Sequence, residues 1–284
     1  MKPNICAPGK YDEENDTCFS IDQLVSMAEA YNRLWVKNPT PNLKPIGIKE
    51  NKPYLLNQFR KIFHAACGDS DQKEICWTKQ TFMNKIVEEM ETFRPEGPSK
   101  ANEWLSTMHI NDVMRQYEQV YLDFKFLGAV PLNCSALNFC SLYKIDFGTF
   151  GSIHKLGIIF NHDRHGEPGS HWVALFINIP KGEIFYCDST GREPIDDINH
   201  IINKFILYQK SLNKKVLVKV NHIPYQKDGS ECGVYSCNFI IRMLKGEPFE
   251  EIIANPLSFG NINACRNIYF RNRPSKYKVQ KQCD

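Results

Sequence analysis

The chain has 284 residues, 42% of them hydrophobic, and a formal net charge of +3 at pH 7. It is long enough for one large domain, or one domain with a smaller attachment, around a buried core. The longest apolar runs, such as residues 172–179, fall far short of the roughly 20 residues of a membrane span, so we expect none. The first residues lack the basic start and apolar stretch of a secretory signal, and we therefore expect a cytoplasmic protein in a reducing compartment.

Eleven cysteines at irregular spacing argue against a disulfide framework, because such frameworks occur in short secreted chains with an even number of cysteines. We expect most of these thiols to pack as small hydrophobic residues.

Positive charge is concentrated near the C-terminus. The basic residues there, with no acid before Asp284, are Arg266, Arg271, Arg273, Lys276, Lys278 and Lys281. We interpret this segment as a solvated basic tail, and contact with nucleic acid or with an acidic partner is the alternative.

The first hundred residues have helical periodicity and no strand-like alternation. Helices are predicted over residues 20–35, 53–67 and 79–92, each with an apolar stripe. Ser20 and Gln23 form a capping-box pattern at the start of the first helix. We expect residues 1–100 to form a helical N-terminal arm region.

Residues 94–102 are rich in proline, glycine and polar side chains, which predicts a linker or boundary. Beyond it, Asn111 or Asp112 is expected to cap a helix. From Ile153 onward the sequence is rich in β-branched and aromatic residues in short runs. Strands are predicted over residues 153–162, 171–179, 183–188 and 215–222.

Two further helices are predicted in this part of the chain. One begins at Asp196 or Asp197, and the other spans residues 233–244. A small mixed sheet flanked by helices is an α+β domain, which we assign to residues 101–284.

Four residues of this domain have the chemistry of a thiol nucleophile and its helpers. Cysteine catalysis needs a base, a group that orients the base, and donors for the developing oxyanion. His171 begins a predicted strand, Asp188 ends the next, and Gln226 and Cys232 flank a glycine-containing turn. His171 is then the base, Asp188 its orienting acid, and Gln226 an oxyanion donor beside the backbone N–H of Cys232.

The position of Cys232 supports this assignment. A cysteine at a helix N-terminus has its thiolate stabilised by the helix dipole and by unpaired N–H groups. Gly233 follows directly and leaves space for a close backbone approach. Cys237 and Cys187 lack such a setting, and we interpret both as packing residues.

These residues also have plainer interpretations. A single cysteine at the head of an apolar helix is usually a core residue. A zinc site built from His162, Asp163 and His165 with two nearby cysteines has no established ligand spacing, so we expect no metal and no cofactor.

Taken together, "HW", the Asp of "YCDS", and Gln followed after five residues by "CG" resemble the signature of the cysteine protease clan of SUMO (ubiquitin-like protein) proteases and adenovirus protease. The resemblance covers roughly residues 105–245 and implies a papain-like fold in permuted order. It implies the triad His171, Asp188 and Cys232, with Gln226 in the oxyanion hole. Trp172 would line a narrow cleft that admits glycine before the cut bond.

SUMO proteases carry a Trp-Leu-Asn-Asp element before this core. The corresponding stretch here is assigned to "HINDVM", which makes His109 a substrate-binding residue, and "EWLS" at residues 103–106 is the competing alignment. A helical arm before a core with this signature resembles the arrangement in the polyprotein-processing proteases of large cytoplasmic DNA viruses, such as African swine fever virus.

The leading hypothesis is a cysteine endopeptidase that cuts viral structural polyproteins after glycine, at Gly-Gly-X or Ala-Gly-X sites, during virion maturation. It would act on protein substrates in the host cytoplasm or the virion. The alternatives are an isopeptidase for SUMO or another ubiquitin-like modifier, an acetyltransferase-type effector, and an inactive binding module.

Overall fold

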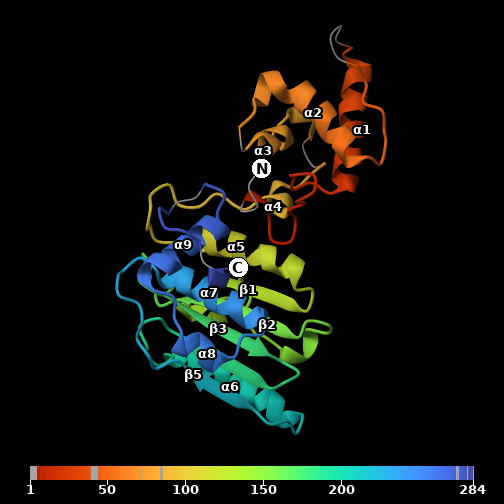
Figure 1. The fold of residues 1–284 in the computed structure, drawn as a ribbon. Helices are drawn as coiled ribbons and strands as arrows, with labels where there is room; N and C mark the ends of the chain where they lie inside the picture. Colours follow the sequence, from red (N-terminus) through yellow and green to blue (C-terminus); the bar gives the residue numbers. More distant parts are fainter. Residues whose placement is uncertain are drawn as a thin grey trace. The chain divides into compact units, whose positions relative to one another are not determined.

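The computed structural model describes residues 5–39, 44–70, 72–83, 86–272, 275–279 and 281–283. The chain divides into two compact units, Met1–Pro95 and Glu96–Asp284, both drawn in Figure 1. The division falls inside the stretch 94–102 that the sequence predicts as a linker. None of the helices within the described ranges is long and apolar enough to cross a lipid bilayer.

The first unit is built from helices, as the sequence predicts. Its elements are α1 (Ile21–Lys37), α2 (Lys52–Cys67), α3 (Lys73–Thr78), a 3₁₀ turn (Thr81–Met83) and α4 (Glu89–Thr92). The predicted capping box is confirmed: the Ser20 side chain accepts from the backbone N–H of Gln23, and the Gln23 side chain accepts from the backbone N–H of Ser20. Each bond satisfies a donor that the helix start leaves without a partner.

Aromatic residues form much of the core of this unit. Phe19 stacks on Trp77 with ring centroids 6.1 Å apart, and Phe59 and Phe63 pack on the other sides of the same indole. All four side chains are buried. The apolar stripes of α1 and α2 therefore meet over Trp77, which α3 supplies.

The predicted helix over residues 79–92 is wrong. α3 ends at Thr78, where the Gln80 side chain donates to the carbonyl of Cys76 and so competes with helical continuation. Met83 and Val87 still reach the core, but from short separate turns. Asn84 and Lys85 lie outside the described residues.

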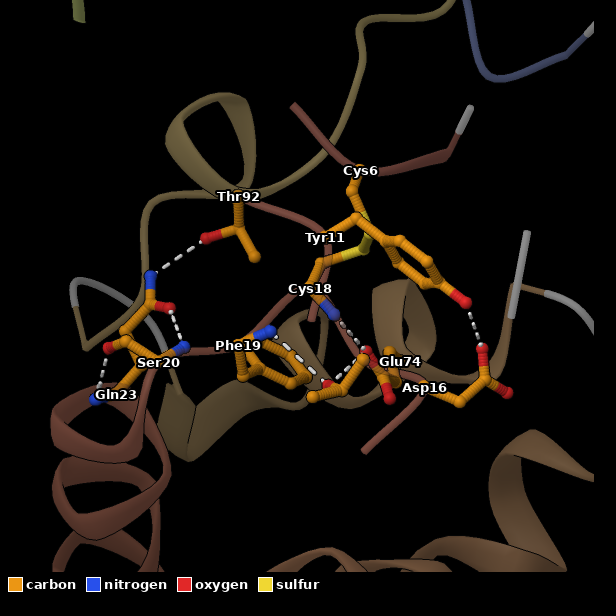
Figure 2. Close-up of a disulfide and its surroundings, with 10 residues drawn as sticks. Cys6, Tyr11, Asp16, Cys18, Phe19, Ser20, Gln23, Glu74 and Thr92 are labelled. Carbon is orange, nitrogen blue, oxygen red and sulfur yellow. Dashed lines mark hydrogen bonds between the residues drawn. A yellow bond between two sulfur atoms is a disulfide. The ribbon is translucent and has the colours of Figure 1, made fainter. Parts of the chain in front are cut away.

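A disulfide joins Cys6 to Cys18 at the start of this unit, as Figure 2 shows. Glu74 of α3 lies beside it and accepts hydrogen bonds from the Thr17 hydroxyl at 2.9 Å and from the backbone N–H of Cys18 at 3.2 Å. The buried carboxyl of Glu74 therefore fastens the loop before α1 to α3.

The second unit contains a five-stranded mixed sheet, which confirms the α+β class. The strands are β1 (Phe124–Pro131), β2 (Lys155–Asn161), β3 (Trp172–Asn178), β4 (Glu183–Cys187) and β5 (Leu217–Val220), in spatial order β1-β2-β3-β4-β5. The outer pairs β1–β2 and β4–β5 are parallel, and the inner pairs are antiparallel.

Helices cover both faces of this sheet in Figure 1. The helices are α5 (Thr107–Val120), α6 (Asp196–Ser211), α7 (Cys232–Leu244), α8 (Phe249–Ala254) and α9 (Phe259–Tyr269). Alternate residues of β3 point to opposite sides: Ala174 and Phe176 join the core of α5 and α7, while Val173 and Leu175 join the core of α6. Every residue of α7 is buried, so this helix is the centre of its layer.

Three elements and two caps differ from the sequence prediction. β1, α8 and α9 were not predicted. α5 begins at Thr107 with Ser106 as its cap, and α6 has no side-chain cap. Asn111 instead accepts from the backbone N–H of Ala129 and ties α5 to β1. The hydrogen-bond partner of Asn111 is 18 residues away in the sequence, so the local pattern does not indicate it.

The expectation of reduced, packing cysteines is wrong for eight of the eleven. The disulfides are Cys6–Cys18, Cys67–Cys76, Cys134–Cys140 and Cys265–Cys283. Cys187, Cys232 and Cys237 are free and buried. Paired cysteines are the opposite of what a reducing compartment predicts.

The interpretation of the C-terminal segment as a solvated basic tail is wrong for Arg266 and Arg271, whereas Lys276, Lys278 and Lys281 are exposed as expected. Arg266 belongs to α9 and is fully buried, and Arg271 is buried with a 2.7 Å bond to Glu96. The disulfide of Cys265 with Cys283 holds the end of the chain against α9. Arg273 and Asp284 lie outside the described residues.

Candidate active site

Neighbouring strands bring the predicted base and its acid together. His171 directly precedes β3 and Asp188 directly follows β4, and these antiparallel strands pair Ala174 with Cys187. The end of one strand therefore lies beside the start of the other. His171 Nε2 and Asp188 Oδ1 are 2.7 Å apart.

Cys232 is the first residue of α7, and its sulfur lies close enough to His171 to raise the pKa of the imidazole. Nε2 of the imidazole is engaged by Asp188, so Nδ1 is the nitrogen left to face the thiol. The structure therefore brings the three side chains together in the order acid, base and sulfur.

Asp188 is held as a charged acceptor. It is fully buried, and its Oδ1 also accepts from the backbone N–H and the hydroxyl of Thr190, at 2.7 and 2.9 Å. Its backbone carbonyl accepts from the Asn221 side chain at 2.6 Å. Burial raises the pKa of Asp188, but the bonds from His171 and Thr190 outweigh burial and hold the pKa below its usual value.

His171 is stabilised in its protonated form. Burial lowers its pKa, but the hydrogen bond to Asp188 and the nearby negative charges of Asp188 and Cys232 raise it to about 9. The imidazole can therefore carry a proton at neutral pH while it faces the sulfur, which is the arrangement in which a thiolate is a ready nucleophile.

The other two free thiols are chemically quiet. Burial raises the pKa of Cys187 to about 12, and it also raises the pKa of Cys237 far above the usual value for a thiol. Cys187 contacts the Tyr225 hydroxyl at 3.0 Å, and the side chain of Cys237, in the second turn of α7, is buried in the core.

Gln226 is anchored beside the triad. The Ser189 hydroxyl donates to its Oε1 at 2.5 Å, and its Nε2 donates to the carbonyl of Asp228 at 2.6 Å. Its backbone N–H donates to the carbonyl of Ser189. One hydrogen of the side-chain amide is thus used to hold the turn, and the second remains for another acceptor.

Trp172 and Leu105 form a wall next to Gly233, the residue that follows Cys232. The indole N–H of Trp172 donates to the carbonyl of Leu105 at 3.0 Å. A Cβ on Gly233 would lie 3.1 Å from Leu105 Cβ and 3.3 Å from Trp172 Cδ1. Gly233 therefore leaves space for the wall itself to approach α7, in addition to any room that it gives a substrate.

The structure favours the competing alignment over the one that includes His109. Trp104 and Leu105 line a hollow of about 290 Å³ together with Gly169, Ser170 and Trp172. His109 is not among the residues that line it. Its side chain completes the capping box with Ser106 and packs edge-on against Phe270.

The two cysteines of the zinc interpretation are not free to bind a metal ion. Cys134 and Cys140 are joined in a disulfide, and His165 packs on Phe139. His162 instead packs edge-to-face against His171, with ring centroids 5.1 Å apart. Within the described ranges, no group of three His, Cys, Asp or Glu residues is arranged to hold a metal ion.

Several residues that shape the site are absent from the sequence prediction. Thr190, Ser189 and Asn221 act through hydrogen bonds to Asp188 or Gln226, and these types are common in any turn. Leu105 had a signal in the competing "EWLS" alignment. Arg266 had none, because its position next to the site depends on the path of α9.

Comparisons with known proteins identify the family of this chain. The model of the Ulp1 protease family, C-terminal catalytic domain, matches residues 150–271. A mimivirus protein assigned as a thiol protease, R355 of Acanthamoeba polyphaga mimivirus, is 52% identical over an alignment 298 residues long. The alignment covers 99% of this chain and 98% of the relative. The cysteine protease S273R of African swine fever virus is 24% identical over 220 residues, or 66% of this chain and 75% of the relative.

The fold is shared as well. The crystal structure of the African swine fever virus protease pS273R aligns with a TM-score of 0.64 at 17% sequence identity, covering 95% of this chain and 96% of that one. The chain therefore belongs to the Ulp1 family of cysteine proteases.

Proposed function

We propose that Cys232, His171 and Asp188 are the catalytic triad and that Gln226 is the oxyanion donor. The observation that carries this assignment is the 2.7 Å bond between Asp188 Oδ1 and His171 Nε2, with Cys232 at the start of α7 close enough to raise the pKa of the same imidazole. His171 and Asp188 lie at facing strand ends, so the backbone fixes their geometry.

In the proposed reaction, the thiolate of Cys232 attacks the carbonyl carbon of the scissile peptide bond. The resulting oxyanion accepts from the free amide hydrogen of Gln226 and from the backbone N–H of Cys232. The His171 imidazolium gives its proton to the departing amine, which leaves a thioester on Cys232. His171 then takes a proton from water, the hydroxide hydrolyses the thioester, and the acid product leaves.

The proposed substrate is a viral structural precursor cut after glycine. The wall of Leu105 and Trp172 stands against Gly233, which leaves little width beside the nucleophile. A narrow passage favours a residue without a side chain before the cut bond. The relatives are proteases of viruses, which supports a viral protein as the substrate; processing would take place in the host cytoplasm or in the assembling particle.

Cleavage of candidate precursors by the purified protein tests this proposal. New N-termini are identified by mass spectrometry and compared with those produced by Cys232→Ala and Cys237→Ala. We expect Cys232→Ala to yield none and Cys237→Ala to keep the cleavage pattern, since Cys237 is buried five residues along the same helix. Cleavage that survives the loss of Cys232, or sites without a small residue before the cut, would contradict the proposal.

A second candidate is cleavage of a ubiquitin-like modifier. Trp104 and Leu105 stand where the Trp-Leu element of SUMO proteases is expected, next to the hollow lined by Trp172. A panel of modifier vinyl sulfones distinguishes the two: covalent labelling of Cys232 by one modifier favours this candidate, and labelling by none favours the precursor substrate.

A further inference from the structure

A buried guanidinium lies behind the nucleophile and takes no part in the mechanism above. Arg266 of α9 has no exposed surface. Its Nε donates to Asn263 Oδ1 at 2.8 Å, and its two terminal nitrogens donate to the carbonyls of Glu103 at 2.8 Å and Ser230 at 2.9 Å. A buried arginine is costly unless such bonds satisfy it, so these partners define one preferred position of the side chain.

The two carbonyls belong to the two segments that meet where Leu105 stands against Gly233. Glu103 lies two residues before Leu105 of the wall, and Ser230 lies two residues before Cys232. The planar guanidinium spans both with donors at fixed angles, which a single lysine ammonium cannot reproduce. Arg266 therefore ties the wall to the nucleophile turn from behind.

The negative charge that balances Arg266 is the carboxylate of Glu231, and it is linked to the guanidinium through Asn263. The terminal nitrogens of Arg266 therefore remain bonded to the two carbonyls. Glu231, buried and adjacent to Cys232, accepts from Asn263 Nδ2 at 3.4 Å and from the Ser230 hydroxyl. Asn263 thus bridges the carboxylate and the guanidinium. Burial lowers the pKa of Arg266 to about 10 and the charge of Glu231 opposes this, so the arginine stays protonated at neutral pH.

We propose that Arg266 is a positioning residue that sets the width of the passage between the wall of Leu105 and Trp172 and the turn that carries Cys232. It thereby sets how strictly the enzyme selects a small residue before the cut bond. The proposal rests on the proposed protease function, and it deepens that function by naming what fixes the selectivity.

Arg242 provides a matched control. It is also a buried arginine, its Nε donates to Glu247 at 2.7 Å, and it reaches the carbonyl of Asn255 at 3.4 Å. It lies in the last turn of α7, at the end opposite to Cys232. Its loss also removes a buried guanidinium but touches neither side of the cleft.

The test compares Arg266→Met, Arg266→Lys and Arg242→Met in the full chain, with folding checked by circular dichroism. kcat and KM are measured on peptides that differ only in Gly or Ala before the scissile bond. We expect the Gly-over-Ala preference in kcat/KM to fall about tenfold in Arg266→Met. The preference of Arg266→Lys should lie between those of the wild type and Arg266→Met, because an ammonium keeps the charge but cannot span both carbonyls. Arg242→Met should keep the wild-type preference.

A second readout does not depend on peptide cleavage. The rate of Cys232 alkylation is measured by peptide mapping with iodoacetamide and with the bulky N-pyrenylmaleimide. We expect the ratio of the bulky to the small rate to rise in the Arg266 variants and to stay unchanged in Arg242→Met. If the wild type cleaves no peptide, the proposed function fails while this ratio still decides the role of Arg266.

An unchanged alkylation ratio in a folded Arg266 variant would overturn the proposal. An equal rise in Arg242→Met would overturn it as well, because the effect would then be general loosening. If Arg266→Met does not fold, Arg266→Lys carries the same decision.

Discussion

Replacement of Glu74 by glutamine should make the first unit more stable at alkaline pH. The Glu74 side chain is almost fully buried, and its Oε2 accepts from the Thr17 hydroxyl and the backbone N–H of Cys18. Glu74 and Cys18 are labelled in Figure 2. Its Oε1 is buried without a hydrogen-bond partner among the described residues. Burial raises the pKa of this carboxyl to about 7, against the hydrogen bonds, which lower it.

The size of the effect follows from this shift. The pKa rises from 4.5 in the unfolded chain to about 7 in the folded one. The folded state therefore binds the proton more tightly, so this contribution is fully present below pH 4.5 and is lost as the pH rises through 7. A shift of this size corresponds to about 3 kcal/mol in the free energy of unfolding at pH 8.5.

A glutamine oxygen accepts the same two bonds and does not ionise. We expect Glu74→Gln to be more stable than the wild type by about 3 kcal/mol at pH 8.5 and about equal to it near pH 4.5. The assay is a urea titration of the disulfide-intact chain at both pH values, read by pulsed hydrogen exchange and mass spectrometry on peptides of α1 and α3. Glu29→Gln, at an exposed position of α1, serves as the control.

A difference between Glu74→Gln and the wild type that is the same at both pH values would refute the reasoning, because the effect would then not arise from ionisation. Lower stability of the variant at pH 8.5 would refute it too. A matching gain in Glu29→Gln would assign the effect to net charge instead of to the buried site.

Three further predictions concern the catalytic unit. Asp188→Asn should lower kcat about 10³-fold. It should also move the alkaline limit of kcat/KM from about pH 9 toward lower pH, because the Asp188 carboxylate raises the pKa of His171. A pH profile of unchanged shape would contradict this prediction. Gly233→Ala should raise KM for peptide substrates and cost about 1–3 kcal/mol of stability, since the new methyl group meets the wall at 3.1 Å; steady-state kinetics and thermal melts measure both, and wild-type kinetics would argue against it. Replacing Cys265 and Cys283 by serine should lower the free energy of unfolding by about 3 kcal/mol, as expected for residues 18 apart; chemical denaturation tests this, with unchanged stability as the contrary result.

Local signals explain what the sequence could predict. The capping box of Ser20 and Gln23 depends on residues three apart, and it is present as predicted. The strands β2 to β5 have compact β-branched and aromatic runs, and the structure contains all four. The spacing of His171, Asp188 and Cys232 indicates the proposed triad, because these residues stand at the ends of predicted elements.

The rest depends on contacts between distant segments. Asn111 was expected to cap a helix, but its side chain bonds to β1, and Ser106 caps instead. Arg266 belongs to a run of basic residues that resembles a tail, and only the path of α9 turns it toward Ser230 and Glu103. Neither outcome follows from periodicity or from local composition.

The four disulfides have a practical consequence for work on this enzyme. Each closes a short loop within one unit, over 6 to 18 residues, while Cys232 is a free thiol. Reducing agents that protect a catalytic thiol from oxidation also open such bridges. Activity should therefore rise and then fall with increasing dithiothreitol, and a preparation handled at the concentrations usual for cysteine proteases would understate what the enzyme can do.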